Sequence, residues 1–179
     1  MRKLLSIVVV AFLSFTTGHS QGVFDIGAGG GFPVFDASDF SNFAFNIDAA
    51  YLFEVAEDIE VGPSVSYLHF VGSSEEISIA PLGTTTINYD DVAFLPIAGQ
   101  AKWEFAEEWR IRLEVGYAIG ASSGNDGGFY WSPGVSYEVV DDLEIVGTLR
   151  VVAENSFSWG TINFGVTYTF DNDDDEDDD

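Results

Sequence analysis

His69 is the residue best suited to acid–base chemistry, because it is the single histidine after the first twenty residues. A histidine with a serine and a carboxylate can catalyse acyl transfer, and nearby candidates are Ser66, Ser73, Ser74, Glu75 and Glu76. Their spacing matches no triad motif. In a strand, His69 would also point outward on the same face as Tyr67. We therefore interpret His69 as an interfacial histidine, and we predict no catalytic residue, no cofactor and no enzymatic activity.

The lysines and arginines are the next candidates for chemistry, and they occur among glutamates. Only Lys102, Arg110, Arg112 and Arg150 follow the first twenty residues, against 30 Asp and Glu. All four lie on the polar side of alternating segments, as do Glu54, Glu60, Glu104, Glu114, Glu138 and Glu144. Opposite charges tolerate a low-dielectric interior when they are paired. We predict a structural charge network of Lys102, Arg110, Arg112 and Arg150 with Glu60, Glu104, Glu114 and Glu144.

Three other patterns exclude or weaken further chemistry. The run 27–31 begins like a dinucleotide-binding loop, but Phe32 replaces the last glycine and no helical pattern follows. The tail 171–179 carries eight acids without the glycine and distant glutamate of a calcium loop, so we predict no metal site and a disordered tail. The net charge of −24 excludes nucleic-acid binding through phosphates.

The elements that position these residues are strands. In the run 160–170, Ile162, Phe164, Val166, Tyr168 and Phe170 alternate with small and polar residues. A period of two places alternate side chains on opposite faces of a sheet. This run therefore predicts a strand with one apolar face and one small, polar face.

Similar segments around 53–61, 103–111 and 137–145 each contain two adjacent acids, which predicts three short exposed turns. Longer, turn-rich connections lie at 33–42, 71–90, 122–128 and 154–158. Eight strands fit between them, at 23–32, 43–55, 59–70, 91–105, 109–121, 129–140, 143–153 and 159–170. We predict an all-β fold, an eight-stranded antiparallel transmembrane up-and-down β-barrel. Pro63, Pro96 and Pro133 fall inside strands, where we expect a weakened ladder with bulges or bends.

The first residues have the pattern of an export signal. Arg2 and Lys3 precede an apolar run from Leu4 to Phe15 that is too short for a spanning helix, and small residues surround position 20. We expect a signal peptide at 1–20, a barrel domain at 21–170 and an acidic tail at 171–179. The chain contains no cysteine, so disulfides cannot stabilise it.

Alternation alone fits a soluble barrel as well as a membrane barrel. A membrane barrel, with lipid around its apolar face, is favoured because the polar face consists mostly of small residues and because the cations all lie on that face. An aromatic girdle also gathers near the short turns, made up of Trp103, Phe105, Trp109, Tyr137, Tyr168 and Phe170. Leu52, Leu68, Phe70, Phe94 and Tyr130 fall on the inward register and add bulk to a narrow interior, so a wide pore is not expected.

The export signal, the eight alternating strands and the final strand together resemble the small outer-membrane β-barrel family that includes the OmpA barrel and OmpX. The resemblance covers residues 22 to 170. It implies that Phe164, Val166, Tyr168 and Phe170 form the signal read by the barrel assembly machinery. The chain departs from the family by continuing past Phe170 into the acidic tail.

We expect a monomer in the outer membrane of a Gram-negative bacterium, with extracellular loops and both termini periplasmic. Its expected role is structural or surface-interactive, through envelope integrity or loop-mediated binding, and 71–90 is the longest loop. The alternatives are a narrow porin-like transporter for small or apolar solutes and a lipid-modifying enzyme that uses His69. Expected partners are outer-membrane lipid, the assembly machinery and divalent cations that bridge the acidic loops to lipid phosphates.

Overall fold

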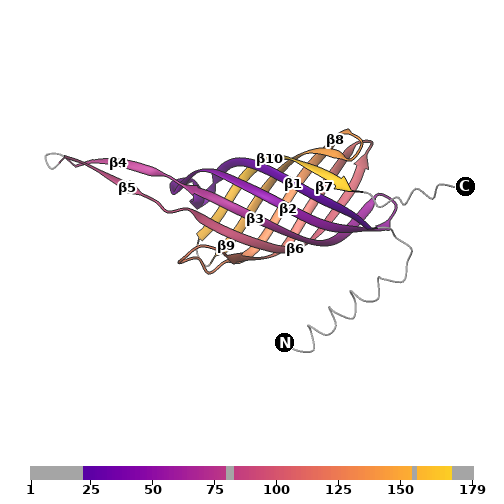
Figure 1. Cartoon of the computed structure of the whole chain (residues 1–179), viewed down its shortest axis with the longest axis horizontal. Helices are drawn as coiled ribbons and strands as arrows, with labels where there is room; N and C mark the ends of the chain where they lie inside the picture. Colours follow the sequence, from indigo (N-terminus) through magenta and orange to yellow (C-terminus); the bar gives the residue numbers. More distant parts are fainter. Residues whose placement is uncertain (1–21, 80–82, 155–156, 171–179) are drawn as a thin grey trace, which may run out of the picture.

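The computed structural model describes residues 22–79, 83–154 and 157–170. Eight long strands close an antiparallel barrel in the order β1-β10-β9-β8-β7-β6-β3-β2 (Figure 1). They are β1 (Gly22–Val34), β2 (Ser41–Ala56), β3 (Ile59–Gly72), β6 (Val92–Ala106), β7 (Trp109–Gly120), β8 (Gly128–Val140), β9 (Leu143–Glu154) and β10 (Phe157–Phe170). The first and last strands pair from Phe24 with Phe170 to Val34 with Gly160. The predicted antiparallel up-and-down barrel is therefore confirmed, with strand ends within two residues of those expected.

The segment 71–90 is not the open loop that the sequence suggested. Its described residues form β4 (Ser74–Ile79) and β5 (Gly83–Asn88), which pair as a separate two-stranded sheet. Isoleucine and threonine supply the β-branched side chains that favour such strands. The hairpin projects beyond the barrel, at the end opposite the start of β1 and the end of β10 (Figure 1). The connection 33–42 also contains a short 3-10 helix, η2 (Phe35–Asp39).

The outer face of the barrel is apolar and the inner face is polar along most of its length. Exposed outward side chains include Ile47, Ile97, Leu113, Val115, Phe164 and Val166, whereas buried polar ones include Asp25, Asn46, Lys102, Glu144 and Asn163. The predicted orientation, with the apolar face outside, is confirmed. A closed sheet with this exterior satisfies its backbone hydrogen bonds internally, as lipid requires.

Among the described residues, no helix is long and apolar enough to cross a bilayer.

The three short turns share one design. Asp58, Glu108 and Asp142 each have a positive φ, of 66°, 67° and 68°. Their carbonyl oxygens accept backbone N–H groups from Glu104, Glu138 and Thr169, each at 2.9 Å. Each turn is thus hydrogen-bonded to the next strand beyond its own hairpin, which links the first turn to β6, the second to β8 and the third to β10.

The bulges predicted at the prolines do not occur there. Register shifts occur instead between Ser41 and Phe43 and beside the short turns, at Glu54/Ala56, Glu104/Ala106 and Glu138/Val140. Each proline does interrupt one ladder: Pro63 with β2, Pro96 with β3 and Pro133 with β9. The pairing on the other side continues unshifted, because a missing N–H removes bonds on one side without adding a residue.

The aromatic side chains near the short turns are arranged in neighbouring pairs. The ring centroids lie 6.2 Å apart for Trp103 and Phe105, 4.9 Å for Trp109 and Tyr137, and 4.7 Å for Tyr168 and Phe170. These residues occupy the positions expected of an interfacial girdle.

The glycines of β1 allow the lumen to be filled from the other walls. A methyl group on Gly31 would overlap the carbonyl oxygen of Ile162 and the side chain of Asn163. By contrast, a methyl group on Gly99 in β6 would meet no atom within 4 Å. The two positions therefore form a matched pair for testing how tightly the barrel closes.

We predict that Gly31→Ala lowers the yield of folded barrel, because overpacking costs about 1–3 kcal/mol and here the obstacle includes backbone. Gly99→Ala should fold like the parent chain. The measurement is the fraction of refolded protein that migrates as the compact, unheated form in detergent gels. Equal yields for the two variants would contradict the described β1–β10 closure.

Candidate functional site: the filled lumen

The lumen contains two layers with different chemistry. Towards the short turns its side chains are charged, and towards the loop end they are apolar. Inward positions of the strands supply both layers, since every second residue points inside. On β6, for example, Lys102 lies in the charged layer and Phe94 in the apolar one.

Glu144 on β9 is the centre of the charged layer, and its side chain is 2% exposed. Arg110 Nη1 and Lys102 Nζ donate to Glu144 Oε1 at 2.8 Å and 3.1 Å. Arg112 Nη1 lies 3.8 Å from Glu144 Oε2. One carboxylate thus connects β9 to two other strands, β6 and β7.

Further carboxylates balance the same cations. Lys102 Nζ lies 2.9 Å from Asp25 Oδ2 on β1 and 3.7 Å from Glu60 Oε2 on β3. The guanidinium of Arg110 lies 3.0 Å from Glu104 Oε2 and also contacts Glu138. The cations are therefore surrounded by carboxylates from five strands, β1, β3, β6, β8 and β9.

A second ionic group lies around Arg150 on β9. Its Nη1 and Nη2 donate to the two oxygens of Asp48 at 2.9 Å and 2.8 Å, a bidentate geometry. Arg150 Nη1 also donates to Tyr130 Oη at 3.1 Å, and Tyr130 Oη donates to Glu114 Oε2 at 2.6 Å. Gln100 joins this group to Arg112, because in the amide orientation that satisfies both partners it donates to Glu114 and accepts from Arg112 at 3.1 Å each. We call the two groups together the lumen charge network.

The eight residues predicted for the network all lie in or beside these two groups. Lys102, Arg110, Glu60, Glu104 and Glu144 come together, Arg112 lies at the edge, and Arg150 is near Glu114 at 3.8 Å. The prediction omitted Asp25 and Asp48, which are the partners of Lys102 and Arg150. Alternation already places Asp48 on the polar face of its strand, opposite Ile47 and Tyr51, so it could have been included. Asp25 was harder to place, because glycines dominate β1 and large side chains do not mark its faces.

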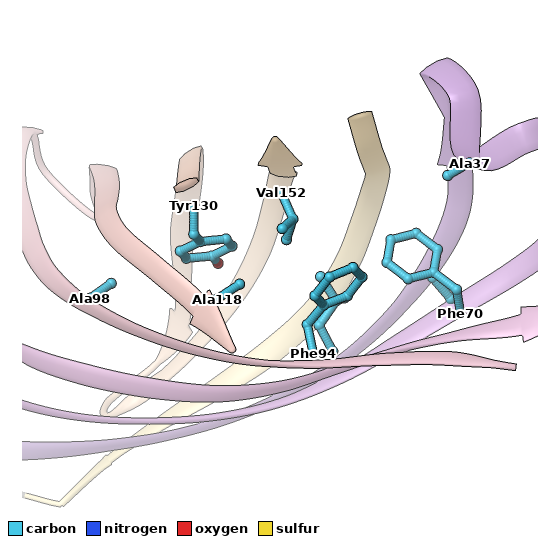
Figure 2. Packing of buried hydrophobic residues seen from close by; sticks show 9 residues of the cluster. Ala37, Phe70, Phe94, Ala98, Ala118, Tyr130 and Val152 are labelled. Carbon is cyan, nitrogen blue, oxygen red and sulfur yellow. The ribbon is translucent and has the colours of Figure 1, made fainter. Parts of the chain in front are cut away.

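The loop half of the lumen is closed by a hydrophobic plug, made up of Ala37, Ala44, Leu68, Phe70, Phe94, Ala98, Ala118, Tyr130 and Val152. Figure 2 shows these side chains converging from opposite walls of the barrel. The rings of Phe70 and Phe94 meet edge to face with centroids 6.2 Å apart. The inward bulk predicted for Leu52, Leu68, Phe70, Phe94 and Tyr130 is confirmed, since all five are fully buried.

His69 lies on the outer face near the base of the hairpin. Its Nδ1 is 3.0 Å from Tyr67 Oη, its Nε2 is 3.1 Å from Asp91 Oδ2, and its ring stacks on Phe45. Asp91 Oδ1 accepts the Gly72 N–H at 2.8 Å. Both ring nitrogens are engaged without a serine, and the nearby Ser66 is buried on the lumen side. The geometry therefore suits a brace for the hairpin base better than a catalytic triad.

Several predictions concern residues beyond this site. The signal peptide at 1–20 and the acidic tail at 171–179 lie outside the described residues. Phe164, Val166, Tyr168 and Phe170 are exposed on the outer face of β10, and their role as an assembly signal stays a prediction. Within residues 22–79, 83–154 and 157–170, no group of three or more His, Asp or Glu side chains is arranged to hold a metal ion. Cation bridging from single loop carboxylates also stays a prediction.

Comparison with known proteins identifies the fold. No family model matches the sequence, and a search of curated proteins finds no match. The crystal structure of Ail, the attachment invasion locus protein of Yersinia pestis, matches with a TM-score of 0.57 and 13% identity over 86% of this chain and 100% of that chain. Ail in a phospholipid bilayer nanodisc matches with a TM-score of 0.55 and 14% identity over 85% of this chain and 100% of that chain.

The N-terminal β-barrel domain of Pseudomonas aeruginosa OprF matches with a TM-score of 0.50 and 15% identity, over 85% of this chain and 100% of that chain. At these identities the similarity establishes the fold and not the activity. The chain has the fold of the small eight-stranded outer-membrane β-barrels, so the predicted transmembrane fold class is confirmed.

Replacing Glu144 with glutamine should weaken the barrel, because three cations would lose their shared anion. Removal of one partner from a buried ion pair costs about 3–5 kcal/mol. The measurement is urea unfolding in lipid vesicles, followed by tryptophan fluorescence. The control is Glu57→Gln, which removes one exposed turn charge and should change stability little. Equal unfolding midpoints for the two variants would contradict the central role of Glu144.

The pKa of Asp91 should lie below its ordinary value of 3.8, because its carboxylate accepts the Gly72 N–H and, secondarily, contacts His69. A lowered pKa means that the contact stabilises the hairpin base above the ordinary pKa and is lost as the pH falls through the folded value. The check is an NMR titration of the Gly72 amide. His69→Ala should raise the titration midpoint towards 3.8 without reaching it, because the Gly72 N–H remains. Midpoints at or above 3.8 in both the parent and the variant would refute the role of Asp91 and His69 as a brace.

Proposed function

We propose that this protein is a closed outer-membrane barrel that acts at the cell surface by presenting its loop end to partners. The observation that carries this proposal is the contrast between a filled lumen and a long projecting hairpin. The charge network and the hydrophobic plug fill the two halves of the interior, while β4 and β5 extend beyond the barrel wall. The extended part of the molecule is therefore better suited to contact than the interior is to conduction.

A transport role is disfavoured by the two lumen layers acting in series. A solute would have to separate the ion pairs of Glu144 and Arg150 and then displace the rings of Phe70 and Phe94. Breaking buried ion pairs is costly, and an eight-stranded barrel has no spare width to move the side chains aside. The polar contacts inside the barrel contribute to stability, which also fits a contribution to envelope integrity.

The hairpin offers a physical means of recognition. Among the described residues, β4 and β5 pair only with each other, so each has an outer edge with free N–H and C=O groups. Such edges can pair with an extended segment of another protein. The fold similarity to Ail, an attachment invasion locus protein, is consistent with a surface role but does not carry it.

The proposal includes an orientation in the membrane. The hairpin and the other long connections would face the outside of the cell, and the short turns with both chain ends would face the periplasm. The protein would be a monomer, with the apolar band that includes Leu113 and Val115 in contact with lipid. The assembly machinery would recognise the strand that ends at Phe170. Divalent cations would link the acidic loops to lipid phosphates.

The test uses a photo-crosslinking amino acid placed in the native envelope. At Thr85, exposed on β5, it should give protein adducts that external protease removes, whereas at the lipid-facing Val115 it should give none. Large, stable, single-step conductance of the purified barrel in planar bilayers, with no adduct at Thr85, would refute the surface role and favour the transporter.

A further inference from the structure

The loop end of the barrel opens into a pocket whose walls are aromatic and whose edge is acidic. It is lined by Phe40, Tyr89, Asp90, Glu154, Phe157 and Trp159, together with Val92, and holds about 670 Å³ of space that opens to solvent. We call it the mouth pocket. Neither the lumen charge network nor the hairpin accounts for this combination of side chains.

The mouth pocket is built from the inward register of the strand ends. On β10, Phe157 and Trp159 share the inner face with Thr161 and Asn163, which are buried in the lumen. On β9, Glu154 shares the inner face with Val152. The pocket is therefore the top of the lumen and not a crevice on the outer wall.

Trp159 makes a firm floor for the pocket. Its ring centroid lies 5.3 Å from that of Phe70 and 5.9 Å from that of Phe94, so it rests directly on the hydrophobic plug. A floor supported by packed rings needs no rearrangement before a ligand binds. Pre-organisation of this kind lowers the entropic cost of binding.

The aromatic walls are held in the same way. Phe40 lies 5.1 Å from Tyr89 and 5.5 Å from Phe157, and Phe157 lies 4.9 Å from Trp159, measured between ring centroids. The backbone also fixes two of them, because Ser73 N donates to Phe40 O and Tyr89 N donates to Ser73 O, each at 2.9 Å. Four rings thus surround one open space.

The charge of the mouth pocket is negative and uncompensated by basic side chains. Glu154 Oε1 accepts the Asp126 N–H at 2.7 Å, which fixes this carboxylate at the edge. Asp90, which follows Tyr89 in the sequence, also lines the pocket. Every Lys and Arg among the described residues is engaged in the lumen charge network. A cation entering the mouth therefore meets carboxylates without a competing ammonium or guanidinium.

We propose that the mouth pocket binds a small organic cation, an alkyl- or quaternary ammonium group without a neighbouring anion. The faces of aromatic rings attract such cations, and the rings also shelter the alkyl substituents. The two carboxylates add attraction for positive charge and repel phosphates and sulfates. This inference deepens the proposed surface function, because it rests on the loop end facing the surroundings and names a ligand class for it.

The experiment measures binding to the folded full chain by calorimetry in a sugar detergent, since detergents with choline head groups would compete. The three ligands are choline, its neutral isostere 3,3-dimethylbutan-1-ol, and phosphocholine. Choline should bind saturably and at least tenfold more tightly than the other two. The neutral isostere tests the charge, and phosphocholine separates a free ammonium ligand from a lipid head group.

Paired variants locate the site. Asp90→Asn with Glu154→Gln keeps the shape of the pocket and should abolish the preference for choline over its isostere. Phe157→Leu should weaken choline binding at least threefold, and it avoids disturbing the plug as a change at Trp159 could. The matched control Glu76→Gln removes an exposed acid of the hairpin and should leave binding unchanged.

Three outcomes would overturn the inference: equal affinities for choline and its isostere, choline binding that survives the double carboxylate variant, or no binding of choline. None of these affects the crosslinking expected at Thr85, so the ligand class can fail while the surface role stands. Tighter binding of phosphocholine than of choline would also reject the free ammonium and favour a lipid head group.

Discussion

The structure depends on the pairing of charges inside a narrow barrel. Glu144 accepts hydrogen bonds from Arg110 and Lys102, and Lys102 also forms an ion pair with Asp25. These contacts join β9, β7, β6 and β1 across the lumen and not only along the sheet. In lipid the outer face gives little preference for one compact arrangement over another, because hydrocarbon surrounds it in any case. Cross-lumen contacts between fixed partners can therefore specify which walls face each other, provided that each charge has a partner.

The separation of the lumen into an ionic half and an apolar half follows from the same constraint. Ion pairs gain strength where water is excluded, and the plug of Phe70, Phe94 and Tyr130 excludes it from the loop side. Tyr130 belongs to both halves, since its ring packs in the plug and its hydroxyl contacts Arg150 and Glu114. The plug also supports Trp159 from below, which makes the loop-end mouth a shallow pocket with a floor instead of the entrance to a channel.

Sequence reasoning gave the fold because alternation is unambiguous wherever large side chains mark both faces. Trp109 to Ile119 on β7 and Ile162 to Phe170 on β10 are such cases. It failed where that contrast is absent. The glycines of β1 hid the inward position of Asp25, and the polar, turn-rich composition of 71–90 hid a hairpin in which Thr85, Thr86 and Ile87 are exposed. The mouth pocket could not be predicted at all, because Phe40, Tyr89 and Trp159 are remote in sequence and meet only through barrel closure.

The distribution of charge along the barrel axis limits what can approach each end. The basic side chains of the described residues are all used inside, so the acids of the turns and loops remain unbalanced at the two ends. Anionic partners are therefore repelled at both ends, and the repulsion is long-ranged only at low salt. Cations are attracted at both ends, and at the loop end the carboxylates line a pocket whose walls are aromatic rings. Electrostatic attraction alone would bind cations weakly and without selectivity at either end of the barrel. At the loop end, the aromatic floor that rests on the hydrophobic plug provides a basis for selecting among cations.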